Sequence, residues 1–164
     1  MKKHVEQRYY FDTNALLKYY NPWIKHYQEE KGILQIRRLV SNSHTAVLVS
    51  PLTTLEIVGK LTYFFRQNLL KRRNLYVITD HLKKDIGIST TNRPFEMVAM
   101  PKSAFRLAET ILLENAQFAI SSNDALHLAI VKKLLDTPIM VTSDKSLQNV
   151  CERIQITFYD PEIE

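Results

Sequence analysis

The chain has 164 residues, a net charge of +5, three glycines and one cysteine. This length fits one domain, residues 1–164, that can bury a sizeable core without a zinc or disulfide staple, and Cys151 has no second cysteine to pair with. Residues 1–8 lack the apolar stretch of a signal peptide and no later run reaches the roughly 20 apolar residues of a membrane span, so we expect a cytoplasmic protein without a membrane partner.

Short apolar runs bounded by turn residues predict the strands of a sheet. Segments with helical periodicity separate these runs, and that alternation favours a parallel sheet with right-handed crossovers. The predicted strands cover about 8–12, 46–49, 95–100, 139–141 and 155–159.

Capping residues and apolar residues at helical spacing predict the helices between the strands. A long helix is expected to begin at Thr53 or Thr54 and to run to about Arg73, and the polar stretch 88–94 is expected to be a loop. The other predicted helices lie at about 14–20, 23–41 and 75–86, from Ser103, from Ser121 or Ser122 through Leu135, and at about 145–152.

Basic residues gather in the predicted long helix, interleaved with Tyr63, Phe64 and Phe65. One interpretation is a solvated helix face whose aromatic residues lie in the core. The other is a rim that contacts phosphates, as in proteins that bind nucleic acid. The basic residues are Lys60, Arg66, Lys71, Arg72 and Arg73.

Four acids follow apolar runs or stand in the first turns of predicted helices: Asp12, Glu56, Asp124 and Asp144. Each acid alone could cap a helix, although Glu56 fits that role least because it lies about a turn into its helix. Open α/β sheets bind ligands at the carboxyl edge, and carboxylates that meet there raise one another's pKa unless a cation intervenes. Oxygen-only ligands suit Mg²⁺ or Mn²⁺, ions that serve phosphodiester hydrolysis.

Small polar residues stand at the ends of the same predicted strands and can hold carboxylates in ligating orientation. Their alternative role is ordinary capping, which we favour for Ser50. His127 follows Asp124 by three residues, and we interpret it as a structural histidine rather than a catalytic base. The small polar residues are Thr13, Asn14, Ser50 and Thr142.

Four blocks, at 11–14, 50–57, 123–129 and 141–144, occur in the order found in PIN domains, and the chain resembles the VapC-type toxin ribonucleases of that family. The resemblance implies a three-layer α/β/α Rossmann-like fold with a central parallel sheet of strand order 3-2-1-4-5. It also implies RNA cleavage that depends on Mg²⁺ or Mn²⁺. By position, the metal-site acids would be Asp12, Glu56 and Asp124, with Asp144 as the fourth, and the residues shaping the site would be Thr13 or Asn14 together with Thr142.

The resemblance also implies a small antitoxin protein as a partner. In VapC-like toxins the region that corresponds to 22–42 and 60–90 often receives the antitoxin and contributes to contacts in a homodimer, which is a competing explanation for the basic residues. Many relatives carry a further acid two residues after the fourth acid and an aromatic residue next to it. Here Ser146 and Leu147 stand in those places, which argues against a second tightly held metal ion.

Two alternatives to a ribonuclease remain open from the sequence. A PIN-like module could bind RNA or a protein without cutting, although the presence of all four acids argues against it. A phosphatase of the haloacid-dehalogenase type also has a first strand that ends in Asp, but it needs a second acid where this chain has Asn14.

Overall fold

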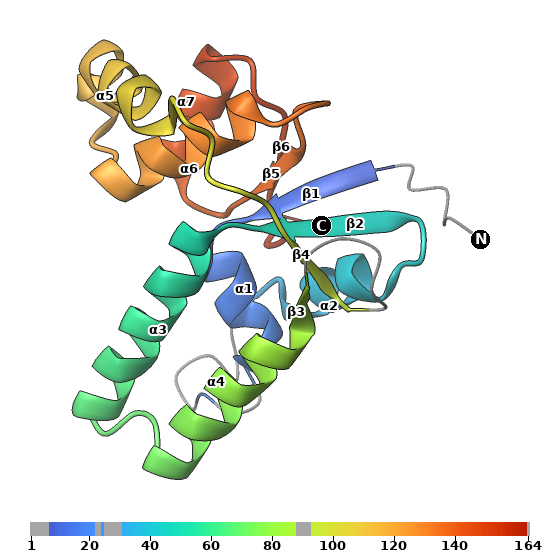
Figure 1. Cartoon of the computed structure of the whole chain (residues 1–164). Helices are drawn as coiled ribbons and strands as arrows, with labels where there is room; N and C mark the ends of the chain where they lie inside the picture. Colours follow the sequence, from blue (N-terminus) through green and yellow to red (C-terminus); the bar gives the residue numbers. More distant parts are fainter. Residues whose placement is uncertain (1–6, 22–23, 25–30, 88–92, 164) are drawn as a thin grey trace.

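The computed structural model describes residues 7–21, 24, 31–87 and 93–163. Within these ranges six strands form one parallel sheet in the order β3-β4-β2-β1-β5-β6 (Figure 1). The strands are β1 (Gln7–Phe11), β2 (Thr45–Val49), β3 (Ile86–Gly87), β4 (Phe95–Met97), β5 (Ile139–Val141) and β6 (Phe158–Tyr159).

The predicted sheet is confirmed, with one addition. Five of the strands, β4-β2-β1-β5-β6, stand in the predicted order 3-2-1-4-5. The sixth, β3, is an edge strand of two residues that pairs with β4, in a place where the sequence predicted the end of a helix. β4 and β6 are shorter than predicted and cover only 95–97 and 158–159.

Helices connect the strands and cover both faces of the sheet. Because neighbouring residues of a strand point to opposite faces, Tyr9 and Phe11 join one apolar core while Tyr10 joins the other. The first core lies under the helices α1 to α4, and the second lies under α5 to α7, which gives the three predicted layers (Figure 1). The helices are α1 (Thr13–Tyr19), α2 (Ile33–Ser41), α3 (Pro51–Arg66), α4 (Arg72–Asp85), α5 (Ala104–Glu114), α6 (Ser122–Lys133) and α7 (Lys145–Arg153).

The predicted long helix to Arg73 is wrong at both ends. Its N-cap is Ser50 rather than Thr53 or Thr54, because Pro51 suits the first turn and the Ser50 Oγ accepts the Thr53 N–H at 3.3 Å. The helix ends at Arg66, the chain turns through a left-handed residue at Asn68 (φ +58°), and α4 begins a separate helix. The predicted helix at 75–86 is this α4, which begins at Arg72.

The predicted helix at 23–41 is described only in its second half. Residues 22–23 and 25–30 lie outside the described ranges, as do residues 88–92 of the predicted loop. α2 begins after Gly32, whose φ of +82° favours glycine. A Cβ atom at this position would lie 2.8 Å from the Pro161 carbonyl oxygen, so the C-terminal segment packs against the start of α2 only because the side chain is absent.

Cys151 is fully buried in α7, and burial raises the pKa of its thiol to about 12. Cys151 thus packs in the core, and such a thiol is a poor nucleophile. In the part of the chain that the structure describes, every helix is too short or too polar to cross a membrane.

Candidate functional site

Asp12 directly follows β1 and caps α1. Its Oδ1 accepts the Ala15 backbone N–H at 2.7 Å, and only 6% of the residue is exposed. Burial raises the pKa of Asp12, and the Ala15 N–H, the Thr142 hydroxyl and His127 only partly offset this effect. The neighbouring Asp124 raises the pKa further. The protein alone therefore compensates the charge of Asp12 poorly.

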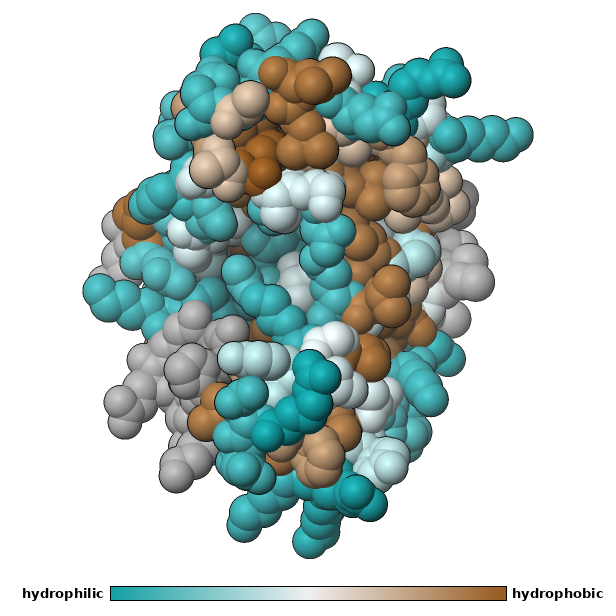
Figure 2. All heavy atoms as spheres, turned by 90° about the vertical axis from the view of Figure 1, so that its left-hand side faces the viewer, coloured by the Kyte–Doolittle hydropathy of each residue, from teal (hydrophilic) through white to brown (hydrophobic). Residues whose placement is uncertain are grey.

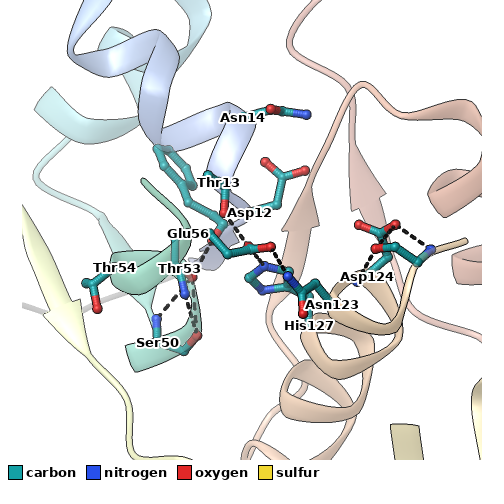
Figure 3. A network of polar contacts seen from close by, with 12 residues as sticks. Asp12, Thr13, Asn14, Ser50, Thr53, Thr54, Glu56, Asn123, Asp124 and His127 are labelled. Carbon is teal, nitrogen blue, oxygen red and sulfur yellow. Dashed lines mark hydrogen bonds and ion pairs between the residues drawn. The ribbon is translucent and has the colours of Figure 1, made fainter. Parts of the chain in front are cut away.

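Glu56 lies in the second turn of α3 and accepts hydrogen bonds from two other helices (Figure 3). The Thr13 hydroxyl donates to Oε2 at 2.5 Å, the His127 Nε2 lies 2.7 Å from the same oxygen, and the Asn123 amide donates to Oε1 at 2.7 Å. Burial alone would raise the pKa of Glu56, but the bonds from His127, Thr13 and Asn123 outweigh it and lower the pKa to about 2. Glu56 is therefore ionised and held in place.

His127 connects this carboxylate to the core. Its side chain is 2% exposed, and its Nδ1 lies 2.8 Å from the hydroxyl of Tyr10, a fully buried residue of β1. The histidine is structural in that it fills the core, but it also contacts a predicted site acid directly.

Asp124 and Asp144 both occupy capping positions. The Asp124 Oδ2 accepts the backbone N–H of Ser121 at 2.8 Å and its hydroxyl at 2.7 Å, which completes a capping box at the start of α6. In Figure 3 this carboxylate lies apart from Asp12 and Glu56. Asp144 is exposed and caps α7 by accepting the Leu147 N–H at 3.1 Å.

The four acids thus stand at the carboxyl edge of the sheet without forming a ready-made cage. Among the described residues, no group of three or more His, Cys, Asp or Glu side chains is arranged to hold a metal ion. The chemistry of the donors nevertheless fits a hard cation, because capping occupies one oxygen of a carboxylate and leaves the second, and because the charge of Asp12 is poorly compensated. Viewed from the carboxyl edge, hydrophilic residues gather in the centre of the surface (Figure 2).

Two of the predicted small polar residues contact the acids. Thr13 donates to Glu56, as described above. The Thr142 hydroxyl hydrogen-bonds Asp12 and also accepts the Asp144 backbone N–H at 3.2 Å, so it connects the ends of β1 and β5.

The other two lie further from the carboxylates. Ser50 is fully buried, caps α3 and contacts the Tyr10 hydroxyl at 2.8 Å, which agrees with the capping role favoured for it. Asn14 is exposed, and its Oδ1 accepts the Lys60 Nζ at 3.2 Å.

Sequence reasoning missed two members of the network, Asn123 and Tyr10. Asn123 and His127 are four residues apart and therefore lie on one face of α6, a spacing that could have linked them. No comparable signal marks Tyr10, because its role depends on where β1 places its hydroxyl beneath α6.

The basic residues do not share one helix, contrary to the prediction. Lys60 lies about one turn beyond Glu56, whereas Arg66 lies about 15 Å further along α3 than that acid. The Arg72 guanidinium lies 5.7 Å from the centre of the Phe65 ring, a cation–π contact that ties α4 to α3. Lys60 and Arg66 belong to α3, Lys71 precedes α4, and Arg72 and Arg73 begin it.

The sequence matches the family described as PIN domain over residues 9–153. The chain belongs to the PIN-domain family. The matched range begins in β1, ends at the last residue of α7 and contains all four acids.

Solved structures show the same fold at low sequence identity. FitAcB from Neisseria gonorrhoeae aligns with a TM-score of 0.65 at 14% identity, covering 95% of this chain and 99% of that one. VapBC2 from Rickettsia felis, bound to a DNA fragment from its promoter, aligns at 0.61 and 13%, covering 94% and 98%. DNA-bound VapBC from Salmonella typhimurium aligns at 0.62 and 15%, also covering 94% and 98%. No curated protein matches this chain in sequence.

Proposed function

We propose that this PIN-domain protein is a metal-dependent endoribonuclease that acts as the toxin of a toxin–antitoxin pair in the cytoplasm. The observation that carries the proposal is Asp12, a buried acid at the carboxyl edge whose pKa is raised mainly by burial and further by Asp124. A protein that keeps such an acid loses stability unless a cation offsets the charge.

Mg²⁺ or Mn²⁺ is the proposed cofactor. The proposed ligands are Asp12, Glu56, Asp124 and Asp144, and the support is that each follows a strand or stands in the first two turns of a helix. When bound, such an ion polarises phosphoryl oxygens and lowers the pKa of water.

Residues of this chain hold the proposed metal-binding carboxylates in place. Thr13, Asn123 and His127 hold Glu56 ionised, and Thr142 fixes Asp12 relative to the end of β5. An acidic centre on a chain with net charge +5 also suits an anionic polymer, because surrounding basic residues attract the backbone that the acids alone would repel.

The proposed partner is a small antitoxin. The support is the likeness to the VapBC and FitAB structures, which match nearly the whole length of this chain. A homodimer, through the helices that follow β1 and β2, belongs to the same proposal.

Cleavage of a single-stranded RNA oligonucleotide tests the nuclease. We expect cleavage with millimolar Mn²⁺, none with EDTA, and none from Asp12→Asn. Asp80→Asn is the matched control, because Asp80 is an exposed acid of α4 that pairs with Lys84 four residues later. Cleavage that survives EDTA or Asp12→Asn would refute the proposed site.

RNA binding without any cutting by the wild-type protein would favour a non-catalytic binding module instead. Induced expression in a bacterial host tests the toxin. Growth should stop with the wild-type chain and continue with Asp12→Asn at equal protein level, and equal growth of both cultures would contradict the toxin assignment.

A further inference from the structure

A chain of buried polar contacts runs from the core to Glu56. The Tyr10 hydroxyl, in a fully buried residue, lies 2.8 Å from the Ser50 Oγ, 3.4 Å from the Thr53 Oγ1 and 2.8 Å from the His127 Nδ1. On the other side of the imidazole, Nε2 lies 2.7 Å from the Glu56 Oε2. The chain therefore joins β1, α3 and α6 beneath one carboxylate.

The direction of one bond is fixed by chemistry. Ionised Glu56 only accepts hydrogen bonds, so the His127 Nε2 must carry a proton and act as the hydrogen-bond donor. The other ring nitrogen meets Tyr10, whose hydroxyl can donate or accept and has Ser50 as a further partner. The imidazole is thus held at both nitrogens, which fixes its plane and its tautomer.

Glu56 has three donors, but they are not equivalent. Asn123 is exposed, whereas His127 is buried and held from behind by a second buried group. An ordinary core histidine satisfies its nitrogens inside the core. Here one nitrogen points instead at a carboxylate that is 22% exposed at the sheet edge (Figure 3).

We propose that Tyr10 and His127 are positioning residues that hold the Glu56 carboxylate in the orientation used to bind the metal ion. This inference rests on the proposed function for the metal, while the contact itself can be tested without metal or RNA. Groups that orient a metal-binding carboxylate usually change metal affinity by 10- to 100-fold when removed.

Tyr10→Phe tests the positioning role of the Tyr10–His127–Glu56 contacts, since it removes one hydroxyl and keeps the ring in the core. Tyr9→Phe is the matched control, because the adjacent Tyr9 lies in the core on the opposite face of the sheet and bonds Gln7 at 2.8 Å. We expect Tyr10→Phe to weaken Mn²⁺ binding, measured by calorimetry, by about 10-fold. Tyr9→Phe should change it by less than about twofold.

Nitrogen-15 NMR of the metal-free protein reads the contact separately. We expect a protonated Nε2 in His127, a shift of the Nδ1 signal in Tyr10→Phe, and a shift of the Nε2 signal in Glu56→Gln. If Tyr10→Phe does not fold, the Mn²⁺ affinity of His127→Gln is compared with that of Tyr9→Phe instead, because the glutamine amide can still donate to Glu56 but is not held by Tyr10 in the same way.

The two hypotheses fail in different ways. The positioning role would be refuted by an unprotonated Nε2 in His127. It would also be refuted if Tyr10→Phe and Tyr9→Phe had equal His127 signals and equal Mn²⁺ affinity. A wild-type protein that shows the expected His127 signals but binds no Mn²⁺ would leave the contact intact and refute the proposed metal function.

Discussion

Two acidic networks lie near the carboxyl ends of the strands, and they are compensated in different ways. Glu56 accepts from Thr13, Asn123 and His127, with no lysine or arginine among these partners. Asp160, which follows β6, pairs with the Lys145 ammonium at 2.9 Å and accepts from the Gln148 amide at 2.8 Å.

The two acids therefore differ in whether a lysine side chain neutralises their charge. A lysine partner neutralises Asp160 within the protein and ties the C-terminal segment to α7. Thr13, Asn123 and His127 hold Glu56 in position without a lysine or arginine, and Asp12 and Asp124 add further acidic groups at the same edge. The arrangement around Glu56 therefore retains an attraction for an external cation, whereas the lysine partner weakens that attraction at Asp160.

The largest expected effect is on cleavage. Asp124→Asn should lower the rate of RNA cleavage by about 100-fold or more, the scale observed when a group that stabilises transition-state charge is lost. Asp160→Asn makes the same chemical change in the lysine-paired network and should leave the rate within about threefold. Rates measured on one RNA oligonucleotide at saturating Mn²⁺ give the comparison. Equal losses in the two variants would remove the distinction between the networks.

The next effect is on stability against acid, and here the two networks should behave alike. Burial alone would raise the pKa of Asp160, but bonds from Gln148, the Glu162 N–H and Lys145 lower it to about 2, the value also found for Glu56. Both acids ionise near pH 4 in an unfolded chain. Because the unfolded state then binds more protons, the stabilisation is complete above about pH 5 and is lost as the pH falls towards 2.

Removing either charge should therefore weaken the protein at neutral pH. Asp160→Asn and Glu56→Gln should each lower the free energy of unfolding by about 1–2 kcal/mol at pH 7, and by less at pH 3. Urea unfolding between pH 7 and pH 3 measures this difference. If either variant lost the same amount at both pH values, its stabilisation would not come from the ionised carboxylate.

Asp12 should show a stability effect of the opposite sign. Its pKa is raised by burial, so above that pKa the folded state carries a charge that it holds less well than the unfolded chain does. Asp12→Asn keeps an oxygen to cap α1 and should raise Tm by about 2–4 °C at pH 7 in EDTA, with a smaller gain as the pH falls. Asp80→Asn should change Tm by under about 1 °C. A lower Tm for Asp12→Asn would mean that the protein itself compensates the charge.

Much of the fold could be predicted because it depends on local patterns. The strands β1, β2 and β5 were predicted from their apolar runs, and the candidate acids were predicted from their positions after such runs. β3 could not be predicted, because a strand of two residues shows no periodicity. Ile86 and Gly87 form a strand by pairing with β4, a contact that the local sequence does not reveal. The end of α3 was missed because the residues after Arg66 have helical spacing, whereas the turn at Asn68 depends on packing.

The candidate site was predictable by position but not by orientation. Asp12 and Glu56 follow strands, so their place at the edge follows from topology. Which way a carboxylate points depends on partners from distant segments, such as His127, which lies 71 residues from Glu56. Sequence spacing could therefore suggest that the acids converge, but it could not show that Asp124 turns towards its own helix start.

The smallest expected effect concerns Lys60, which lies about one turn beyond Glu56 in α3. Lys60 is exposed and bonds the Asn14 amide rather than a carboxylate, so its charge remains available to a phosphate, unlike that of Lys145. Lys60→Gln should weaken RNA binding a few-fold and lower the slope of log affinity against log salt by about one, measured with a non-cleaving Asp12→Asn background. Arg73→Gln, at the far end of the α3–α4 pair, should lower the slope by less. An equal fall of the slope in both variants would mean that bound RNA extends along α3 to its C-terminal end. An unchanged slope in both would assign these charges to solubility or to a protein partner.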